Sequence, residues 1–471
     1  MKQLRLSLLA LIVASFALFT ACKKSKSDAT VISVKQTQIG ALLTGDTLCG
    51  TLKGTMVSGK TYIMTCPVTV NFGDTLLMQR GVTIDVEDSQ AYFHIMGVFI
   101  SLGTKDSANW ITVKSISKQD NTNTAGNPSL DPAYTSQKLW LGFSCDTSCP
   151  LCVFKWTHLE FVGGTWSTTP PMSGDKAGST AWAINFTNYN GILVFEDSWM
   201  YGGVDDGMRP NGKFIIQRST FEKEGYQGGD CINPKQGGVG IASFNMFIGC
   251  ATNGTKVSDK GTSTTAPVAQ AEYYNNTYVN GGYRQIQTGR GGDIDYEQGA
   301  FGHCYNNLIA DCKFGYRIVN GTTTIADTAD MHYGYNFQYG DADSLVDQFY
   351  PVGYITIPQS TDIPTPSTYL PTGYVLGATY DAPSLVGKNN PMFASFDLGT
   401  SANININYIS GFDFHLQAGS PAIGKGYTGF TPHVPTGIIQ DPVYGPTYIT
   451  PPNADMGCYP SGATGTAGNQ H

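Results

Sequence analysis

Acidic and basic side chains gather in two short segments, 203–210 and 229–235, which together could carry out acid–base chemistry. Paired carboxylates can bind Ca²⁺ through their oxygens or act as acid and base on a glycosidic bond. A lysine or arginine beside them can remove the proton next to a uronate carboxylate that a cation neutralises. A solvated Asp-Asp-Gly turn would have the same sequence. The candidate catalytic residues are Asp205, Asp206 and Arg209, and the candidate substrate-binding residues here are Asp230 and Lys235.

A further charged segment, 283–297, combines arginines that could grip a carboxylate or a sulfate with aspartates that could hold a cation such as Ca²⁺. An exposed loop of ion pairs would have the same composition, so both interpretations stay open. The candidates are Tyr283, Arg284 and Arg290 for substrate binding and Asp293 and Asp295 for a metal ion.

Aromatic residues are frequent around the same segments. Exposed aromatic rings stack on sugar faces, which favours a ligand groove, whereas an interior column of rings would use the same residues. The seven histidines are scattered and form no Ser/His/Asp or metal-binding pattern. The aromatic candidates for substrate binding are Trp199, Tyr201 and Tyr226.

The elements that must position these side chains are marked by a phrase that recurs through 195–336. Each copy places apolar or aromatic residues around a small polar residue and continues into a Gly, Asn or Asp turn. Such a strand is too short to bury a core alone, whereas stacked copies bury a continuous one, as in a solenoid. The small polar residues, called anchors below, are Ser198, Ser219, Asn245, Asn276, Asn307 and Asn336, at intervals of 21, 26, 31, 31 and 29 residues.

The anchors should form a column along such a stack. Asn suits this column because it tolerates left-handed backbone geometry and because stacked Asn amides hydrogen-bond with their neighbours above and below. The variable intervals predict a constant strand core with loops of different length. Loops on a rigid scaffold are where function is expected.

Alternating apolar residues punctuated by glycine also fill 61–113, which predicts strands. The phrases Gly81-Val-Thr-Ile and Gly103-Thr resemble those of the opening coils of bacterial right-handed parallel β-helix proteins with the pectate-lyase-like fold. This resemblance covers 61–340 and implies an all-β chain, a right-handed parallel β-helix or solenoid with long loop insertions and a C-terminal cap. Pectate lyases and polygalacturonases share the fold, but their Arg-x-Pro-x-x-Arg, Asn-Thr-Asp, Gly-His-Gly and Arg-Ile-Lys phrases do not match here.

The phrases Gly-Ser-Pro-Ala-Ile-Gly-Lys-Gly and Asp-Met-Gly-Cys-Tyr near the end of the chain resemble the ending of many Bacteroidota β-helix proteins. That resemblance implies a closing coil and a cap, which would cover exposed strand edges. The predicted segments are a signal peptide at 1–21, a flexible tether at 22–35, the parallel β-helix at 36–340, a Pro- and Tyr-rich surface segment at 341–388, the final coil and cap at 389–460 and a flexible tail at 461–471.

The first residues have the features of a secretory leader, because Lys2 and Arg5 precede an apolar run. The run ends in Leu-Phe-Thr-Ala-Cys22, which resembles the lipobox of bacterial lipoproteins and implies that Cys22 is acylated. An ordinary signal peptide with an incidental cysteine is the alternative. We therefore expect a lipid anchor in the outer membrane, with the cell surface favoured over the periplasmic face, although Lys23 and Lys24 depart from the acidic Bacteroidota surface-export signal.

Disulfides are permitted in such a compartment, and ten of the eleven cysteines remain after Cys22. Cys49 and Cys66 flank a probable hairpin and could clamp the N-terminal end of the solenoid. The C-x3-C-x2-C cluster at 145–152 favours a local disulfide, with the third cysteine paired elsewhere or free, over a zinc site. The sequence leaves open how Cys231, Cys250, Cys304 and Cys312 pair.

Composition narrows the function. The formal net charge of −8 and the absence of a basic stripe argue against a nucleic-acid partner. We expect a polysaccharide to bind along the lateral groove, without catalysis. The alternatives are a polysaccharide lyase or glycoside hydrolase acting on an acidic glycan, and a structural or adhesive surface protein. A groove in which Asp206, Asp230 and a base converge within hydrogen-bond reach would favour the enzyme.

Overall fold

The computed structural model describes residues 38–116, 139–171, 176–226, 228–320, 324–350, 359–365, 383–396, 398, 412–438, 448–462 and 468–469. All of them belong to the unit Val34–His471. The predicted signal peptide, Cys22 and the tether lie outside the described residues, as does most of the Pro- and Tyr-rich segment. Within the described ranges, no helix has the length and the hydropathy of a membrane span.

The unit is all-β, as predicted, and its sheets are almost entirely parallel. Among the described residues, β30 (Phe393–Ser395) and β31 (Asp413–Leu416) form the antiparallel pair of named strands. The described helical elements are α3 (Asp343–Val346) and the single 3₁₀ turn η2 (Pro383–Leu385). This composition is compatible with a parallel β-helix.

Three rows of parallel strands run along the unit. Row one is the eleven-stranded sheet. Its strands, in the order of pairing, are β1 (Leu42–Leu43), β3 (Gly54–Met56), β5 (Thr75–Met78), β8 (Val98–Leu102), β11 (Leu151–Lys155), β14 (Ile192–Glu196), β17 (Lys213–Gln217), β19 (Val239–Ser243), β22 (Gln270–Tyr274), β25 (His303–Tyr305) and β28 (His332–Gly334).

Row two is part of the fifteen-stranded sheet. It includes the first half of β4, the longest strand of that sheet, and this half pairs with β6. Its strands are β2 (Thr47–Thr51), β4 (Thr61–Val70), β6 (Thr83–Val86), β9 (Asn109–Thr112), β12 (Thr157–Glu160), β15 (Trp199–Tyr201), β18 (Thr220–Glu222), β20 (Met246–Ile248), β23 (Thr277–Val279), β26 (Leu308–Ala310) and β29 (Phe337–Tyr339).

Row three starts from the second half of β4, which pairs with β7 (Phe93–Ile95). An isolated bridge at Ile232 continues the row into a separate three-stranded sheet. The further strands are β10 (Phe143–Cys145), β13 (Ile184–Phe186), β16 (Met208–Pro210), β21 (Thr255–Ser258), β24 (Ile294–Glu297) and β27 (Arg317–Ile318).

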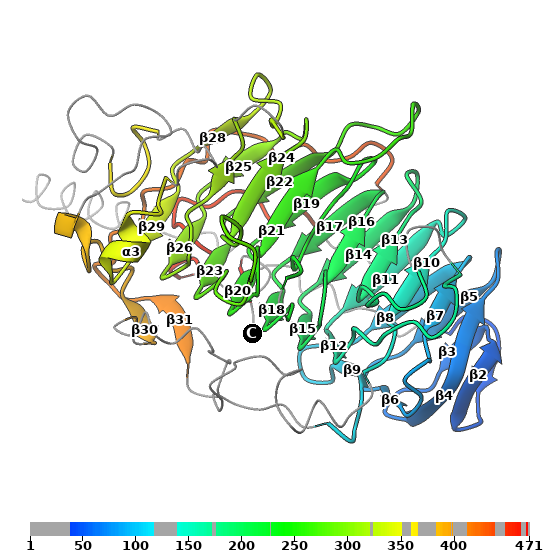
Figure 1. Ribbon diagram of the computed structural model, residues 1–471. Helices are drawn as coiled ribbons and strands as arrows, with labels where there is room; N and C mark the ends of the chain where they lie inside the picture. Colours follow the sequence, from blue (N-terminus) through cyan, green and yellow to red (C-terminus); the bar gives the residue numbers. More distant parts are fainter. Residues whose placement is uncertain are drawn as a thin grey trace, which may run out of the picture. The chain divides into compact units, whose positions relative to one another are not determined.

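The chain visits the three rows in a fixed order. For example, β13 in row three leads to β14 in row one and β15 in row two, and β16 then begins the next round. Each round, called a coil below, pairs with the coil before it and the coil after it. Figure 1 shows the strands following one another along the stack in sequence order, from β2 in blue to β28 and β29 in yellow-green.

The interior between the rows is filled by stacked side chains. Phe221, Phe247 and Tyr278 occupy the same position in three successive coils, with ring centroids 4.9 and 4.8 Å apart. All three are buried, and their spacing matches the separation of about 4.8 Å between neighbouring strands. An inward-facing residue in one coil therefore continues the core of the next.

The predicted column of anchors is confirmed. The backbone N–H of each anchor donates to the side chain of the next one, at 3.0 to 3.1 Å. Side-chain amides also bond directly, as from Asn276 Nδ2 to Asn307 Oδ1 at 3.1 Å. The column extends beyond the predicted anchors, because Thr157 N donates to Ser198 Oγ and Asn336 N donates to Asp362 Oδ1.

The left-handed backbone lies one residue earlier than the anchor. The positive φ angles, from 47° to 60°, belong to the residue that precedes each anchor. An anchor directs its side chain inward along the column, and the sharp turn falls on the residue before it. Asn therefore serves at the anchor positions through the hydrogen bonds of its amide, and not through its tolerance of left-handed backbone geometry. The residues with positive φ are Asp197, Arg218, Phe244, Asn275, Asn306 and Tyr335.

Cysteine pairing agrees with the sequence in one place and differs in others. Cys49 and Cys66 form the predicted disulfide. They do not flank a hairpin, because β2 and β4 pair in parallel. The cluster at 145–152 contains three buried free thiols instead of the predicted local disulfide. The described residues include no group of three or more His, Cys, Asp or Glu placed to hold a metal ion, so the zinc alternative gains no support.

The C-terminal segment, 448–462 and 468–469, lies along the sides of the middle coils. Cys458 N donates to Thr277 Oγ1 at 2.9 Å, and Asn275 Nδ2 donates to the carbonyl of Asp455 at 2.7 Å. Asn469 reaches the carbonyl of Ser219, at 3.0 Å. This part of the chain therefore contacts middle coils. The predicted cap and the predicted segment boundaries remain predictions.

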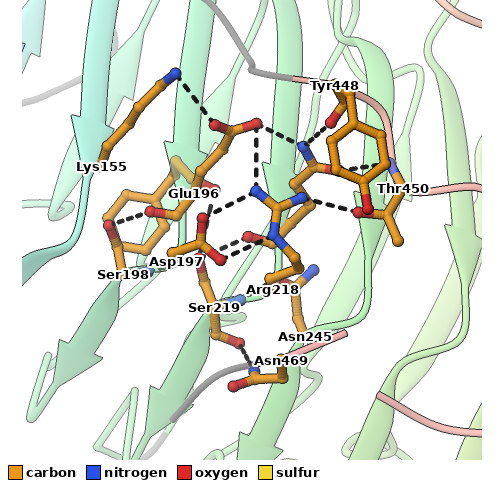
Figure 2. Close-up of polar contacts among 12 residues, drawn as sticks. Lys155, Glu196, Asp197, Ser198, Arg218, Ser219, Asn245, Tyr448, Thr450 and Asn469 are labelled. Carbon is orange, nitrogen blue, oxygen red and sulfur yellow. Dashed lines mark hydrogen bonds and ion pairs between the residues drawn. The ribbon is translucent and has the colours of Figure 1, made fainter. Parts of the chain in front are cut away.

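This segment covers four charged residues, Lys155, Glu196, Asp197 and Arg218, which together with Thr450 of the segment we call the flank network (Figure 2). The Arg218 guanidinium donates to both Asp197 oxygens at 2.8 and 2.9 Å and to Thr450 Oγ1 at 2.8 Å. Lys155 Nζ lies 3.4 Å from Glu196 Oε2. All five side chains are buried, so the network is a closed set of charges inside the protein.

Candidate functional site

Row three carries a column of polar side chains that point away from the apolar interior. Side chains alternate along a strand, and Met208 and Ile294 are buried in the core while their neighbours face the other way. Residues aligned between neighbouring strands in this way lie about 4.8 Å apart. The column contains Arg209 on β16, Asn233 next to the bridge at Ile232, Lys256 on β21, Asp295 on β24 and Arg317 on β27.

A cleft with a volume of about 520 Å³ opens over this column. Its lining is mostly polar and includes as many carboxylates as cations, so it offers both signs of charge within one space. The charged lining residues are Asp205, Asp206, Asp230, Asp295 and Glu297, with Lys235, Lys256, Lys260, Arg290 and Arg317.

Two carboxylates from neighbouring coils share one amide group. Asn233 Nδ2 donates to Asp206 Oδ2 at 2.9 Å and to Asp230 Oδ2 at 2.8 Å. Because one nitrogen bonds both, the two carboxylates are held close together. Asp206 and Asp230 are less than 10% exposed, so little water screens their mutual repulsion.

The backbone fixes this pair in place. The N–H of Asp230 donates to Asp206 Oδ1 at 2.9 Å, and Asn253 Nδ2 donates to Asp230 Oδ1 at 2.7 Å. Gly229 has a φ of 94°, and a Cβ atom there would lie 2.5 Å from the carbonyl carbon of Asp205. A glycine is therefore required where the two acidic turns approach each other.

Lys235 lies next to the two carboxylates, on the other side of Asn233. Its Nζ donates to Asn233 Oδ1 at 2.6 Å and to Ser258 Oγ at 3.0 Å. Asn233 thus links the amine to both carboxylates, since its oxygen accepts from Lys235 and its nitrogen donates to Asp206 and Asp230. The group is a continuous chain of hydrogen bonds within one cleft.

Burial changes the acidity of these groups. It raises the pKa of Asp205 to about 7, and the charge of Asp206 adds to this effect. Burial, followed by the charge of Asp230, also raises the pKa of Asp206. Desolvation lowers the pKa of Lys235 to about 8. The cleft therefore contains a carboxyl group and an amine that both change protonation state near neutral pH.

The part of the cleft around β21, β24 and β27 contains two ion pairs and an exposed arginine. Lys256 Nζ lies 2.9 Å from Glu297 Oε1, and Arg317 lies 3.2 Å from Asp295 Oδ2. Asp295 is almost fully buried and its Oδ1 accepts no hydrogen bond from the described residues. Arg290 also lines the cleft and is exposed. This part of the cleft can receive an anionic group of a ligand.

The structure brings together most of the residues predicted for the first two segments. Asp205, Asp206, Asp230 and Lys235 line the cleft. Arg209 lies at its edge, where its Nε is 3.5 Å from Asp206 Oδ2 and its guanidinium lies over the Trp182 ring at 3.7 Å. Arg209 also lines a second cavity of about 480 Å³.

The predicted aromatic residues lie elsewhere. Trp199 is on β15 in row two, where it stacks on His158 with centroids 5.9 Å apart. Tyr201 is buried and packs edge-to-face against Phe161, so it belongs to the core. Tyr226 is not part of the described cleft lining.

The third predicted segment divides between the cleft and the interior. Arg284 is buried and donates to the backbone carbonyls of Gly249, Glu224 and Gly225, so its guanidinium serves the structure instead of a ligand. Tyr283 donates to the carbonyl of Asp311. Arg290 does line the cleft.

The two aspartates proposed as Ca²⁺ ligands lie in different surroundings. Asp293 is buried beside Gly281, since a Cβ on that glycine would lie 2.2 Å from Asp293 Oδ1. Asp295 pairs with Arg317 and Lys256 in the cleft. Among the described residues, no group of three or more His, Cys, Asp or Glu is placed to hold a metal ion, so Ca²⁺ binding at these two positions stays a prediction.

Sequence reasoning missed several residues of the cleft. Asn233 was visible only as part of a charged phrase, although it bonds Asp206, Asp230 and Lys235. Lys256 and Arg317 were missed because their alignment appears only once the strand register is known.

A histidine site was also missed. His303 Nδ1 bonds the buried carboxylate of Glu272, and His332 stacks on His303 with centroids 5.1 Å apart. Both imidazoles line a cavity of about 750 Å³ together with His433. These histidines are far apart in the sequence, so neither spacing nor motif reveals them.

Comparison of the chain with protein-family models, with curated proteins and with solved structures finds no match, and its function must therefore be argued from the cleft itself.

Proposed function

We propose that this chain is a right-handed parallel β-helix that binds an acidic polysaccharide along row three and cleaves it by β-elimination. The fixed order in which the chain visits three parallel rows supports the helix. The observation that carries the reaction is the convergence of Asp206, Asp230 and Lys235 on Asn233. This convergence is the condition under which an enzyme is favoured over a binding protein.

Lys235 is proposed as the base. A neutral amine has two N–H groups and one lone pair. Asn233 Oδ1 and Ser258 Oγ accept the two N–H groups, which leaves the lone pair for a proton of the substrate. The lowered pKa of Lys235, about 8, makes the neutral form accessible near neutral pH.

Asp205 is proposed as the acid. Its pKa of about 7, raised by burial, keeps a share of the carboxyl groups protonated at neutral pH. Lys235 takes the proton next to the uronate carboxylate, that electron pair forms a carbon–carbon double bond, and the glycosidic bond breaks. Asp205 then protonates the leaving oxygen, so that atoms and charge balance.

The cations of the cleft are proposed to hold the uronate carboxylates of the polymer. Removal of a proton next to a carboxylate requires that its negative charge be offset. Lys256, Arg290 and Arg317 line the cleft and are suited to this role. Neighbouring coils repeat about every 4.8 Å, so row three can contact successive sugars of an extended chain.

The test is an assay on a panel of uronate polymers in which the absorbance of unsaturated products is recorded. The proposal expects unsaturated products from wild-type protein and none from Lys235→Met. New reducing ends without unsaturated products would show that the polymer is cleaved by hydrolysis and not by elimination. Retention of a polymer without any cleavage would leave a binding protein, and no retention of any polymer would favour a structural or adhesive role.

The location is also a proposal. We propose that acylated Cys22 anchors the chain in the outer membrane, with the folded unit favoured at the cell surface, because the Leu-Phe-Thr-Ala-Cys22 ending resembles a lipobox. Growth with a fatty-acid probe should label the wild type and leave Cys22→Ser unlabelled. An unlabelled wild type would end the claim of a lipid anchor.

A further inference from the structure

Two cysteines lie beneath the cleft and have no role in the proposed reaction. Cys231 follows Asp230 directly, and Cys250 lies two residues after β20 ends at Ile248. Their side chains are 0% and 1% exposed. The two Sγ atoms are 2.7 Å apart.

This distance is short for two separate thiols. Other sulfur contacts in the protein are longer, such as 3.3 Å from Cys312 Sγ to the carbonyl of Ala310 and 3.7 Å from Cys149 Sγ to that of Leu151. A disulfide bond is about 2.05 Å long. The Cys231 and Cys250 sulfurs therefore lie between a bond and an ordinary contact, and a small shift would join them.

The backbone already holds the two cysteines in facing positions. Cys231 N donates to the carbonyl of Asn253 at 2.9 Å, and Ile232 bridges to Thr255 in parallel. The N–H of Ala251, next to Cys250, donates to the carbonyl of Glu224 at 2.8 Å. Bond formation thus requires little movement of the backbone at either cysteine.

We propose that Cys231 and Cys250 form a second disulfide of this protein, between the start and the end of one coil, in addition to Cys49–Cys66. The oxidant is a protein or small-molecule disulfide. One cysteine thiolate attacks that disulfide and forms a mixed disulfide, and the second thiolate then displaces the carrier. The cysteines lose two protons and two electrons, and the two sulfurs of the carrier disulfide are released as thiols, one in each step.

The bond should form during folding. Both sulfurs are buried in the finished coils, and burial raises the pKa of the Cys231 thiol well above its ordinary value. A buried neutral thiol reacts slowly with a disulfide carrier. Oxidation therefore precedes the packing of this coil, and the finished bond supports the turn that carries Asp230 and Asn233.

The test counts thiols in denatured protein that was exported to an oxidising compartment and purified without reductant. N-ethylmaleimide labels each free thiol, and intact mass gives the number of labels. In Cys231→Ser, the count should rise by one relative to wild type, because Cys250 is released. Cys250→Ser should give the same rise, whereas the control Cys304→Ser should lose one label.

A second measurement does not depend on any variant. Trypsin cleaves after Lys223, Lys235 and Lys256, which places Cys231 in peptide 224–235 and Cys250 in peptide 236–256. The linked pair should appear without reductant and separate after reduction. A fall of one label in Cys231→Ser, or two unlinked labelled peptides from wild type, would overturn the proposal. Neither readout requires enzymatic activity, so this result and the polymer assay can fail independently.

Discussion

The flank network and the cleft both place charged residues on neighbouring coils, yet they differ in what surrounds those charges. In the flank network, Arg218 is fully buried and its donors are matched by Asp197 and by Thr450 of the C-terminal segment. In the cleft, Lys235 and Asp205 adjoin an open space of about 520 Å³. One set of charges is covered by another segment of the protein, and the other faces an open cleft.

The difference teaches that burial and charge alone do not identify a site in this fold. Both regions contain buried ion pairs, but a covered pair is satisfied internally. In the cleft, burial moves the pKa of Asp205 and the pKa of Lys235 toward neutral pH. The same kind of coil can therefore carry either stability or chemistry, depending on whether another segment crosses it.

The largest expected effect concerns the flank network. Arg218→Met should lower the free energy of unfolding by about 3–5 kcal/mol, because it leaves buried Asp197 without its partner. The control Arg290→Met, at an exposed position of the cleft, should change stability by about 0.5 kcal/mol or less. Denaturant titration measures both, and equal effects would remove the distinction between the two regions.

A smaller energetic effect is expected on catalysis. Lys235→Met should reduce kcat/KM by about 100-fold or more, which corresponds to about 2.7 kcal/mol in the barrier, because the base is lost. Lys155→Met, a matched substitution in the flank network, should lower stability and leave the rate per folded molecule unchanged. Loss of turnover in Lys155→Met would show that the covered charges also serve the reaction.

The pH profile should sharpen the assignment of acid and base. The reactive form combines neutral Lys235, whose pKa is about 8, with protonated Asp205, whose pKa is about 7. Because the base has the higher pKa, activity should rise as the pH approaches about 7 and fall above about pH 8. The profile of kcat/KM is then bell-shaped, with its maximum midway between these values. In Asp205→Asn, the residual activity should no longer decrease with the ionisation of Asp205. An unchanged profile in that variant would assign the acid to another group.

The smallest effect is on stability as a function of pH. The raised pKa of Asp205 means that the folded state binds more protons than the unfolded state between about pH 4 and pH 7. Its contribution to stability therefore decreases as pH rises through this window. Asp205→Asn should lack that dependence and be more stable than wild type at pH 8. Thermal unfolding at several pH values checks this, and a less stable variant at pH 8 would contradict it.

The fold was largely predictable because the anchors repeat in the sequence. Asn245, Asn276 and Asn307 each combine a buried amide with a short apolar strand, and the hydrogen bonds of the column require that combination in every coil. The position of the left-handed residue was not predictable, because residues as different as Arg218 and Phe244 adopt it. Their conformation is imposed by the coil and not by residue type.

The cleft was predictable only in part. Asp206 and Asp230 stand out because charged residues are scarce in this chain. Lys256, Asp295 and Arg317 align with them only through strand pairing, and loops of different length separate this row from the anchors. Spacing along the sequence therefore hides the alignment.

The covering of the flank network could not be foreseen either. Thr450 contacts Arg218 across 232 positions of the chain, and no local pattern connects them. Contacts of this kind depend on where a long connection returns, which short motifs do not encode.

The path of the C-terminal segment has a mechanical consequence. A stack in which each coil touches only its neighbours can lose coils one at a time from an end. Here the C-terminal segment forms hydrogen bonds with the carbonyl of Ser219, the hydroxyl of Thr277 and the side chain of Asn275, so it links several coils directly. When the molecule is pulled from its ends, these coils should rupture in a single event, where an unfastened stack would unravel in coil-sized steps.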